Sequence, residues 1–264
     1  MVEQRLRELD NKLEGLSRRW PVADPQAFLS FQDKLTTLWL YHDHALEGIA
    51  LSGEDISDAL TEKTFPERTR DALCKSIRDH KLTIDFVKQQ GLLHAGQVRG
   101  LVTVPLLRKL HESLAPSEKG EGHPFRSDRV LHRLYHHPII PAGQIAASLR
   151  KLCESIDEAR EAHQHPLLRA VAAHFELMTI YPWPDHNGQV ARLLMNLLLL
   201  ADGYPPAIIR GVERLRYHES LRAGSESLIE LVFDSLHSYC AVAAQFLDSQ
   251  PAEITPKRGK LHAS

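Results

Sequence analysis

The apolar run from Leu193 to Ala201 is the feature that most constrains the fold of this chain. It reads LLMNLLLLA, so a helix there is apolar on nearly every side, with Asn196 as the one interruption. The run is far shorter than the roughly 20 residues that a membrane span needs. A helix that is apolar all round belongs in the centre of a domain. We therefore expect residues 189–201 to form a buried central helix, which Gly203 and the prolines behind it end.

The spacing of apolar residues is helical along almost the whole chain. One face of an N-terminal helix collects Leu6, Leu9, Leu13 and Leu16. Ser52 is placed to cap a helix that follows it, and Gly91 is placed to stop another. Residues 115–143 instead mix prolines, glycines and charges without a helical period. The pattern predicts an all-α fold with one long irregular segment, which holds a short β-hairpin near residues 130–135.

Three parts follow from this pattern. Residues 1–26 form a helical extension, whose apolar face packs on the core or pairs with a second copy in a possible homodimer. Residues 27–249 form the main domain. Residues 250–264 are polar, and we expect them to be a disordered tail.

Composition excludes several classes of partner. The 264 residues are 43% hydrophobic, and the net charge is −2 with scattered basic residues. We therefore expect neither a nucleic acid nor a membrane as partner. The three cysteines have no metal-ligand or redox spacing, and the charged N-terminus is no secretory signal. We expect a soluble, cytoplasmic protein.

The stretch YPWPDHNGQVAR, residues 181–192, carries the strongest chemical signal. Asp185 precedes a turn, where its carboxylate can cap backbone N–H groups or hold a divalent cation. Asn187 and Gly188 tolerate the turn, and the helix start behind them is a natural anion site. Arg192 lies one turn into the apolar helix and must find a carboxylate or a phosphate. The pattern predicts a phosphate site, although a capped helix with a structural ion pair fits it equally well.

This stretch resembles the signature of the Fic domain family, whose usual form is H-P-F-x-(D/E)-G-N-G-R-x-x-R. The likeness continues through residues 174–206, and LRKLHESL at 107–114 resembles the helix before the family's flap. ERLRYHESL at 213–221 resembles a segment near the nucleotide base, and HALEGIALS at 44–52 resembles the inhibitory helix. The resemblance spans about residues 27–247.

The family usually moves AMP from ATP onto a hydroxyl of a target protein. The resemblance therefore implies an all-α core with a flap over residues 122–141, a nucleotide such as ATP or another phosphorylated small molecule, Mg²⁺, and a target protein. Asp185 would hold Mg²⁺, and Glu47 would pair with the second arginine of the signature when the enzyme is off. The positions implied to bind phosphates or base are Asn187, Gly188, Gln189, Arg192 and Tyr217.

Three positions depart from the signature. The general base is replaced by Tyr181, and a phenol with a pKa of about 10 is ionised only about once in a thousand at pH 7. The first glycine is His186, whose Cβ is costly if the backbone needs a positive φ. The first arginine is Gln189, which loses a charge and a bidentate fork. Because losing a base alone costs about 10²–10⁴ in rate, we expect ordinary AMP transfer to be altered or impaired.

Three functions remain open from the sequence, and whether the chain is an enzyme stays open with them. In the first, Tyr181 acts as a catalytic nucleophile or acceptor and His186 supplies the missing imidazole. In the second, a pseudoenzyme binds a nucleotide or a protein and signals by conformation. In the third, the fold is a scaffold. A separate metal site at His132 and His136, which have i, i+4 spacing, is an alternative of another class.

The regulatory role of Glu47 has its own alternative, an exposed glutamate at a helix end. The family usually has serine or threonine four residues before this glutamate and often asparagine after the glycine. Here those positions hold Asp43 and Ile49.

Overall fold

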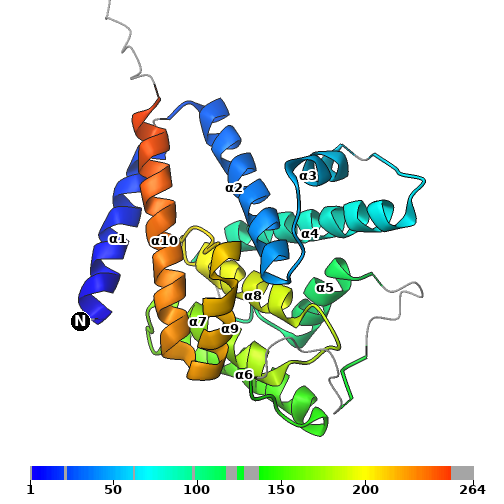
Figure 1. The fold of residues 1–264 in the computed structure, drawn as a ribbon. Helices are drawn as coiled ribbons and strands as arrows, with labels where there is room; N and C mark the ends of the chain where they lie inside the picture. The colour runs from blue at the N-terminus through cyan, green and yellow to red at the C-terminus, as the bar shows by residue number, and fades with distance from the viewer. Residues whose placement is uncertain are drawn as a thin grey trace, which may run out of the picture.

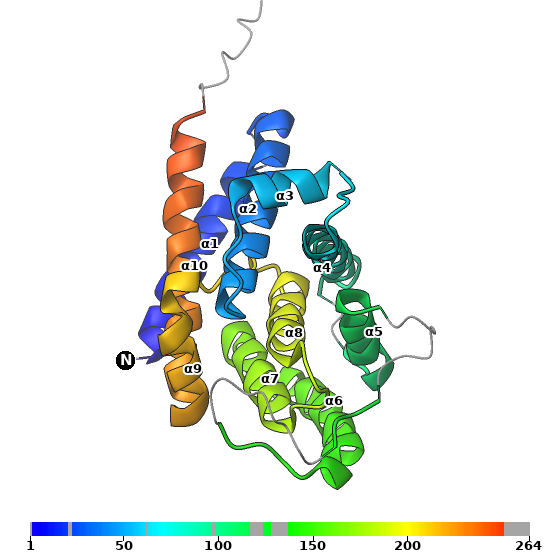
Figure 2. The same ribbon diagram turned by 45° about the vertical axis from the view of Figure 1, so that its right-hand side comes forward.

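Helix α8 (Asn187–Ala201) lies at the centre of the fold, as its sequence predicts. The computed structural model describes residues 2–20, 23–61, 63–96, 99–116, 124–127 and 137–250. Almost every side chain of α8 is buried, including Val190, Leu194 and Leu198. Helices α7 (Pro166–Ile180) and α4 (Arg68–Leu93) make its main contacts, and Figures 1 and 2 show both beside it.

Gly91 lies inside α4 and does not end it, so the stop expected there is wrong. A Cβ at this glycine would lie 2.5 Å from Cβ of Leu200, on α8. The glycine therefore serves the close approach of two helices, and α4 continues to Leu93. Packing rather than termination explains a glycine at this position.

The remaining helices surround this centre, and in the described residues every regular element is helical. Ser52 caps α3 in a reciprocal capping box, because its hydroxyl accepts from the N–H of Asp55 (3.1 Å) while the Asp55 carboxylate accepts from the N–H of Ser52 (2.8 Å). The other elements are α2 (Pro25–Leu46), α3 (Gly53–Leu60), α5 (Val104–Leu114), α6 (Ile145–Glu161), α9 (Arg214–Ala223), α10 (Ser225–Asp248) and the 3₁₀ turns η2 (Ala142–Gln144) and η3 (Gly211–Glu213).

Helix α1 (Val2–Arg19) packs lengthwise against α10 (Figures 1 and 2). Its buried residues are Leu6, Leu9 and Leu16, three of the four on the predicted apolar face. An ion pair joins Arg5 to Glu230 at 2.7 Å. The apolar face is thus covered within the chain, and the homodimer stays a prediction.

The predicted β-hairpin is not seen. Residues 130–135, and with them His132 and His136, lie outside the described residues, as do residues 251–264 of the expected tail. The described parts of the flap, 124–127 and 137–141, contain no strand. They are tied to the end of α7, since Arg126 N–H donates to the carbonyl of Pro182 (2.9 Å) and Ile140 N–H to that of Thr179 (3.1 Å).

Within the described residues, none of the helices combines the length and the apolar character that crossing a bilayer would require.

Candidate functional site

The bend between α7 and α8 is held by the buried amide of Asn187. Its Oδ1 accepts from the N–H of Trp183 (3.0 Å), and its Nδ2 donates to the carbonyls of Trp183 (2.8 Å) and Asp185 (3.2 Å). Tyr181 and His186 both have left-handed backbones, with φ of 49° and 56°. The condition for a costly Cβ at His186 is therefore met, and a non-glycine residue there costs on the order of 1 kcal/mol or more.

Tyr181, at the position of the family's general base, ends α7 and is partly buried. Its carbonyl accepts from Nε of Arg126 at 2.6 Å. Its ring meets the ring of His137 edge-on, with centroids 5.7 Å apart. The imidazole that contacts the Tyr181 ring therefore belongs to His137, in the described part of the flap. That His186 serves Tyr181 as a base stays a prediction.

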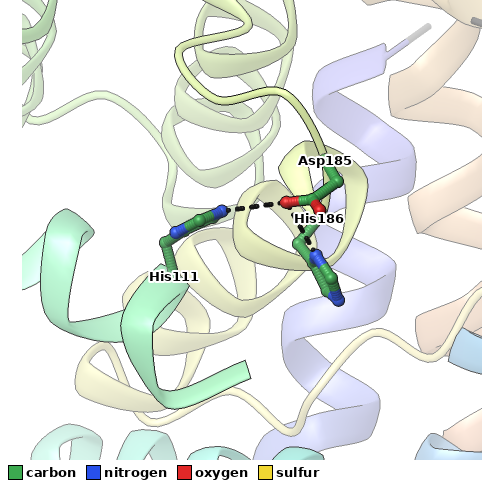
Figure 3. A group of neighbouring side chains, drawn as sticks. All are labelled: His111, Asp185 and His186. Carbon is green, nitrogen blue, oxygen red and sulfur yellow. Dashed lines mark hydrogen bonds and ion pairs between the residues drawn. The ribbon is translucent and has the colours of Figure 1, made fainter. Parts of the chain in front are cut away.

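Asp185 lies at the mouth of the bend between two imidazoles (Figure 3). Its Oδ1 is 3.4 Å from Nε2 of His111, on α5, and 3.0 Å from Nδ1 of His186. Hydrogen bonding to His111 first, and to His186 next, holds the pKa of Asp185 well below its usual range. Its side chain is 63% exposed, so the carboxylate is charged and open to solvent. His111 was not predicted as a site residue, although it lies in the stretch 107–114.

Each of the three nitrogens of the Arg192 guanidinium group has a polar partner. Its Nη2 lies 2.7 Å from Oε1 of Glu47, its Nη1 donates to the hydroxyl of Tyr217 at 3.2 Å, and its Nε pairs with the carboxylate of Asp43. The side chain of Arg192 is only 3% exposed. Glu47 and Arg192 are therefore in contact, and the inhibitory role of this contact stays a prediction.

Asp43 is the acidic partner that the sequence did not assign. Its side chain is 3% exposed, and its second oxygen lies 3.1 Å from Nε2 of His80, on α4. Burial raises the pKa of Asp43, but Arg192 and His80 outweigh burial and hold that pKa well below its usual range. Asp43 and Glu47 are four residues apart near the end of α2. This spacing places two carboxylates on one helix face, a local signal that could have singled out Asp43 beside Glu47 but not its partner on α8.

Gly188 makes room for the pairing of Glu47 with Arg192. A Cβ at this position would lie 2.7 Å from Oε1 of Glu47 and 3.0 Å from Nη1 of Arg192. The glycine thus leaves space for a side-chain contact, while its backbone has no positive φ.

Gln189 and Tyr217 have structural partners in this state. Gln189 is buried, and its Nε2 lies 3.5 Å from Nδ1 of His80. Tyr217 is buried, and its hydroxyl also lies 3.0 Å from Nε2 of His174. Burial raises the pKa of Tyr217 to about 12, so the phenol is neutral. Its place beside a nucleotide base stays a prediction.

The predicted residues thus fall into two groups. Asp185 and His186 lie at the open mouth of the bend, where a divalent cation has a carboxylate within reach. The start of α8, with Gly188 and Arg192, lies behind Glu47. An anion entering at this helix start meets N–H groups, and it reaches the Arg192 guanidinium only if Glu47 moves.

Residues 101–199 match the Fic/DOC family. The protein adenylyltransferase Fic of Drosophila ananassae is 30% identical over 227 residues, which are 85% of this chain and 44% of that protein. The corresponding protein of Drosophila persimilis is also 30% identical, over 85% of this chain and 42% of its own length. The chain therefore spans less than half the length of these curated relatives.

The fold agrees with solved structures of Fic proteins. A Fic domain containing signaling protein from Bacteroides thetaiotaomicron has a TM-score of 0.73 at 17% identity, covering 94% of this chain and 98% of that one. Fic-1 from C. elegans has a TM-score of 0.75 at 18% identity, covering 93% and 72%. With the motif, the family match and the fold in agreement, this chain contains a Fic/DOC family domain at residues 101–199.

Proposed function

We propose that this protein binds a nucleotide or another phosphorylated small molecule at the start of α8, and that ordinary AMP transfer to a target protein is impaired. The observation that carries the proposal is the state of Arg192, which is paired with Asp43 and Glu47 and bonded to Tyr217. A phosphate can replace Glu47, whose side chain is 34% exposed. It cannot easily replace the buried Asp43, so a second negative charge stays beside the arginine.

The residues at the positions that carry out AMP transfer in the family also support the proposal that transfer is impaired here. Tyr181 stands where the family has its base, and a phenol at neutral pH is a poor proton acceptor. Gln189 faces His80 and has no charge to offer a phosphate. The curated relatives are named protein adenylyltransferases, so a target protein is the partner we propose.

A bound nucleotide would bring a divalent cation, and Asp185 would be the residue that holds it. The cation would supply charge to neutralise the phosphates. An exposed, charged carboxylate fits Mg²⁺, which keeps most of its waters and takes one or two carboxylates. The two imidazoles beside Asp185 are not ligands that Mg²⁺ favours.

Calorimetric titration with ATP and Mg²⁺ tests nucleotide binding. Replacing Glu47→Gly removes one carboxylate from Arg192, so we expect ATP affinity to rise by about tenfold, which corresponds to about 1.4 kcal/mol. Glu161→Gly, at the exposed end of α6, is the matched control and should leave affinity unchanged. Equal affinities of wild type and Glu47→Gly would contradict a lock on the phosphate site.

Incubation with α-labelled ATP and candidate target proteins, followed by mass spectrometry, tests transfer separately. We expect no AMP adduct on the protein or a target, even in Glu47→Gly. If the wild type incorporates AMP and Tyr181→Phe does not, the chain has altered transfer chemistry with Tyr181 as nucleophile or acceptor.

A non-catalytic protein-binding module is the second candidate. A groove of about 500 Å³ runs between α2 and α10, and its apolar wall includes the exposed side chains of Leu38 and Val242. Under this function neither the wild type nor Glu47→Gly binds nucleotide. Leu38→Asp with Val242→Asp would then abolish a protein complex that Glu47→Gly leaves intact.

A further inference from the structure

Three potential metal ligands converge at the mouth of the bend from separate elements. His111 comes from α5, Asp185 from the loop, and His186 from the N-cap of α8 (Figure 3). Their ligand atoms, Nε2 of His111, Oδ1 of Asp185 and Nδ1 of His186, are close together, and the cluster fits within 4.8 Å. The chain thus places two imidazole nitrogens and one carboxylate oxygen around one point.

The spacing of these atoms suits a single ion. Zinc binds nitrogen and oxygen at about 2.0–2.1 Å, so neighbouring ligands of a tetrahedral ion lie ~3.3 Å apart. The oxygen of Asp185 lies 3.4 Å from His111 and 3.0 Å from His186. The two imidazole nitrogens lie within 4.8 Å of each other, so they must approach by up to about 1.5 Å for all three ligands to hold one ion.

We propose that His111, Asp185 and His186 form a binding site for a divalent transition-metal ion of the Zn²⁺ class, in preference to Mg²⁺. Imidazole suits zinc, copper, nickel and iron, whereas Mg²⁺ takes oxygen ligands. Three protein ligands leave a coordination position open for water or for a phosphate oxygen. The site shares Asp185 with the proposed nucleotide site, but it does not rest on nucleotide binding.

The surroundings hold two of the three ligands in place. The ring of His111 stacks on buried Trp183, with centroids 4.4 Å apart and planes 10° from parallel. The amide of Asn187 fixes the backbone of the bend. It accepts from the N–H of Trp183 and donates to the carbonyls of Trp183 and Asp185. Outer contacts that orient ligands in this way raise metal affinity.

His186 is the residue that completes the site. It occupies the first glycine position of the signature, and it stands in the left-handed region at φ 56° although it has a side chain. Its Nδ1 is buried, and the 63% exposed carboxylate of Asp185 beside it gives an ion access from solvent. A metal ligand is a reason to keep a histidine at a backbone position that favours glycine.

Calorimetry on the full chain, stripped with EDTA and without nucleotide, tests the proposal. Zn²⁺ and Mg²⁺ are titrated separately into wild type, His186→Gly and Asp185→Asn. We expect the wild type to bind one equivalent of Zn²⁺ at this site at least about a hundredfold more tightly than Mg²⁺. Each variant should lose at least about tenfold in Zn²⁺ affinity, because removing a ligand costs no less than removing an outer contact.

His163→Gly is the matched control for His186→Gly. His163 is exposed and also has a left-handed backbone, at φ 54°. Its replacement removes the same side chain from the same conformation and should leave Zn²⁺ affinity unchanged. Circular dichroism and cooperative thermal unfolding show whether each variant is folded.

A Co²⁺-loaded sample gives a second readout, since its visible absorption reports nitrogen ligands. We expect the bands to change in His186→Gly and in His111→Gln, and not in His163→Gly. Unchanged Zn²⁺ affinity in both His186→Gly and Asp185→Asn, or Mg²⁺ bound as tightly as Zn²⁺, would overturn the proposal. A failure to bind ATP would count against the proposed function alone, because no nucleotide enters these titrations.

Discussion

Individual residues of the bend are explained by side-chain contacts rather than by the turn alone. Gly188 has no side chain because Glu47 and Arg192 meet where a Cβ would be. His186 keeps a side chain where the backbone favours glycine, and that side chain faces Asp185. Which side chains meet at the start of α8 therefore depends on the presence or absence of a side chain at positions 186 and 188.

Gly188→Ala tests the first of these contacts. In an open helix the change adds up to about 1 kcal/mol of stability. Here the new methyl would lie 2.7 Å from Glu47 Oε1, the end of a flexible side chain that is 34% exposed and can turn away, so relieving the overlap costs under about 1 kcal/mol. We expect urea denaturation to show a net loss under about 1 kcal/mol relative to Gly53→Ala, in the first turn of α3, where no atom lies within 4 Å of the new Cβ. A loss of about 2 kcal/mol or more would show that Glu47 does not move aside for the methyl.

At the scale of elements, α2, α4 and α8 are linked by one buried ionic network. Arg192 on α8 pairs with Asp43 and Glu47 on α2, and Asp43 continues to His80 on α4. Buried charges are costly unless they are paired, so removing one partner leaves the others uncompensated. The network therefore fixes the position of the C-terminal end of α2 against α8.

The two carboxylates of α2 should differ in their contribution to stability. Asp43→Asn leaves Arg192 and His80 with a neutral amide in a buried site, so we expect the free energy of unfolding to fall by about 3–5 kcal/mol. Glu47→Gln affects a side chain that is one-third exposed, and we expect a loss under about 1 kcal/mol. Guanidinium unfolding of both variants measures the difference. A loss for Glu47→Gln as large as that for Asp43→Asn would contradict the assignment of Asp43 as the structural partner.

Across the whole molecule, several buried or partly buried histidines are held in neutral form. Burial lowers the pKa of His174 to about 3 and that of His218 to about 4, and it also lowers the pKa of His44. The unfolded chain protonates these groups below a pH of about 6.5. Between the two pKa values the unfolded state binds more protons than the folded state, so stability rises with pH in that range.

The expected consequence is a loss of stability on mild acidification. The free energy of unfolding should fall as the pH drops from 7 to 5, with His174 contributing at most about 1.4 kcal/mol per pH unit. His174→Gln should reduce this slope, whereas His163→Gln, at an exposed position, should not. Urea unfolding at several pH values measures it. A slope that is the same in wild type and His174→Gln would show that His174 is not kept neutral by burial.

Local features of this protein were accessible from the sequence because they depend on neighbours along the chain. The central helix follows from an apolar run, the start of α3 from Ser52, and the bend from Asn187 and Gly188. The role of Gly91 was not accessible in this way. A glycine that ends a helix and a glycine that lets two helices touch look alike until Leu200 is placed beside it.

The sequence by itself determined the all-α class, the buried α8, the bend before it and the departures at Tyr181, His186 and Gln189. Only the tertiary structure decided which side chains surround them. Asp43 reaches Arg192 across 149 residues, and His111 reaches Asp185 across 74. Such pairs depend on how α2 and α5 pack around α8, and no local spacing encodes that packing. The physical reason is that helix periodicity specifies which face is buried, whereas its partner is chosen by the packing of the whole core.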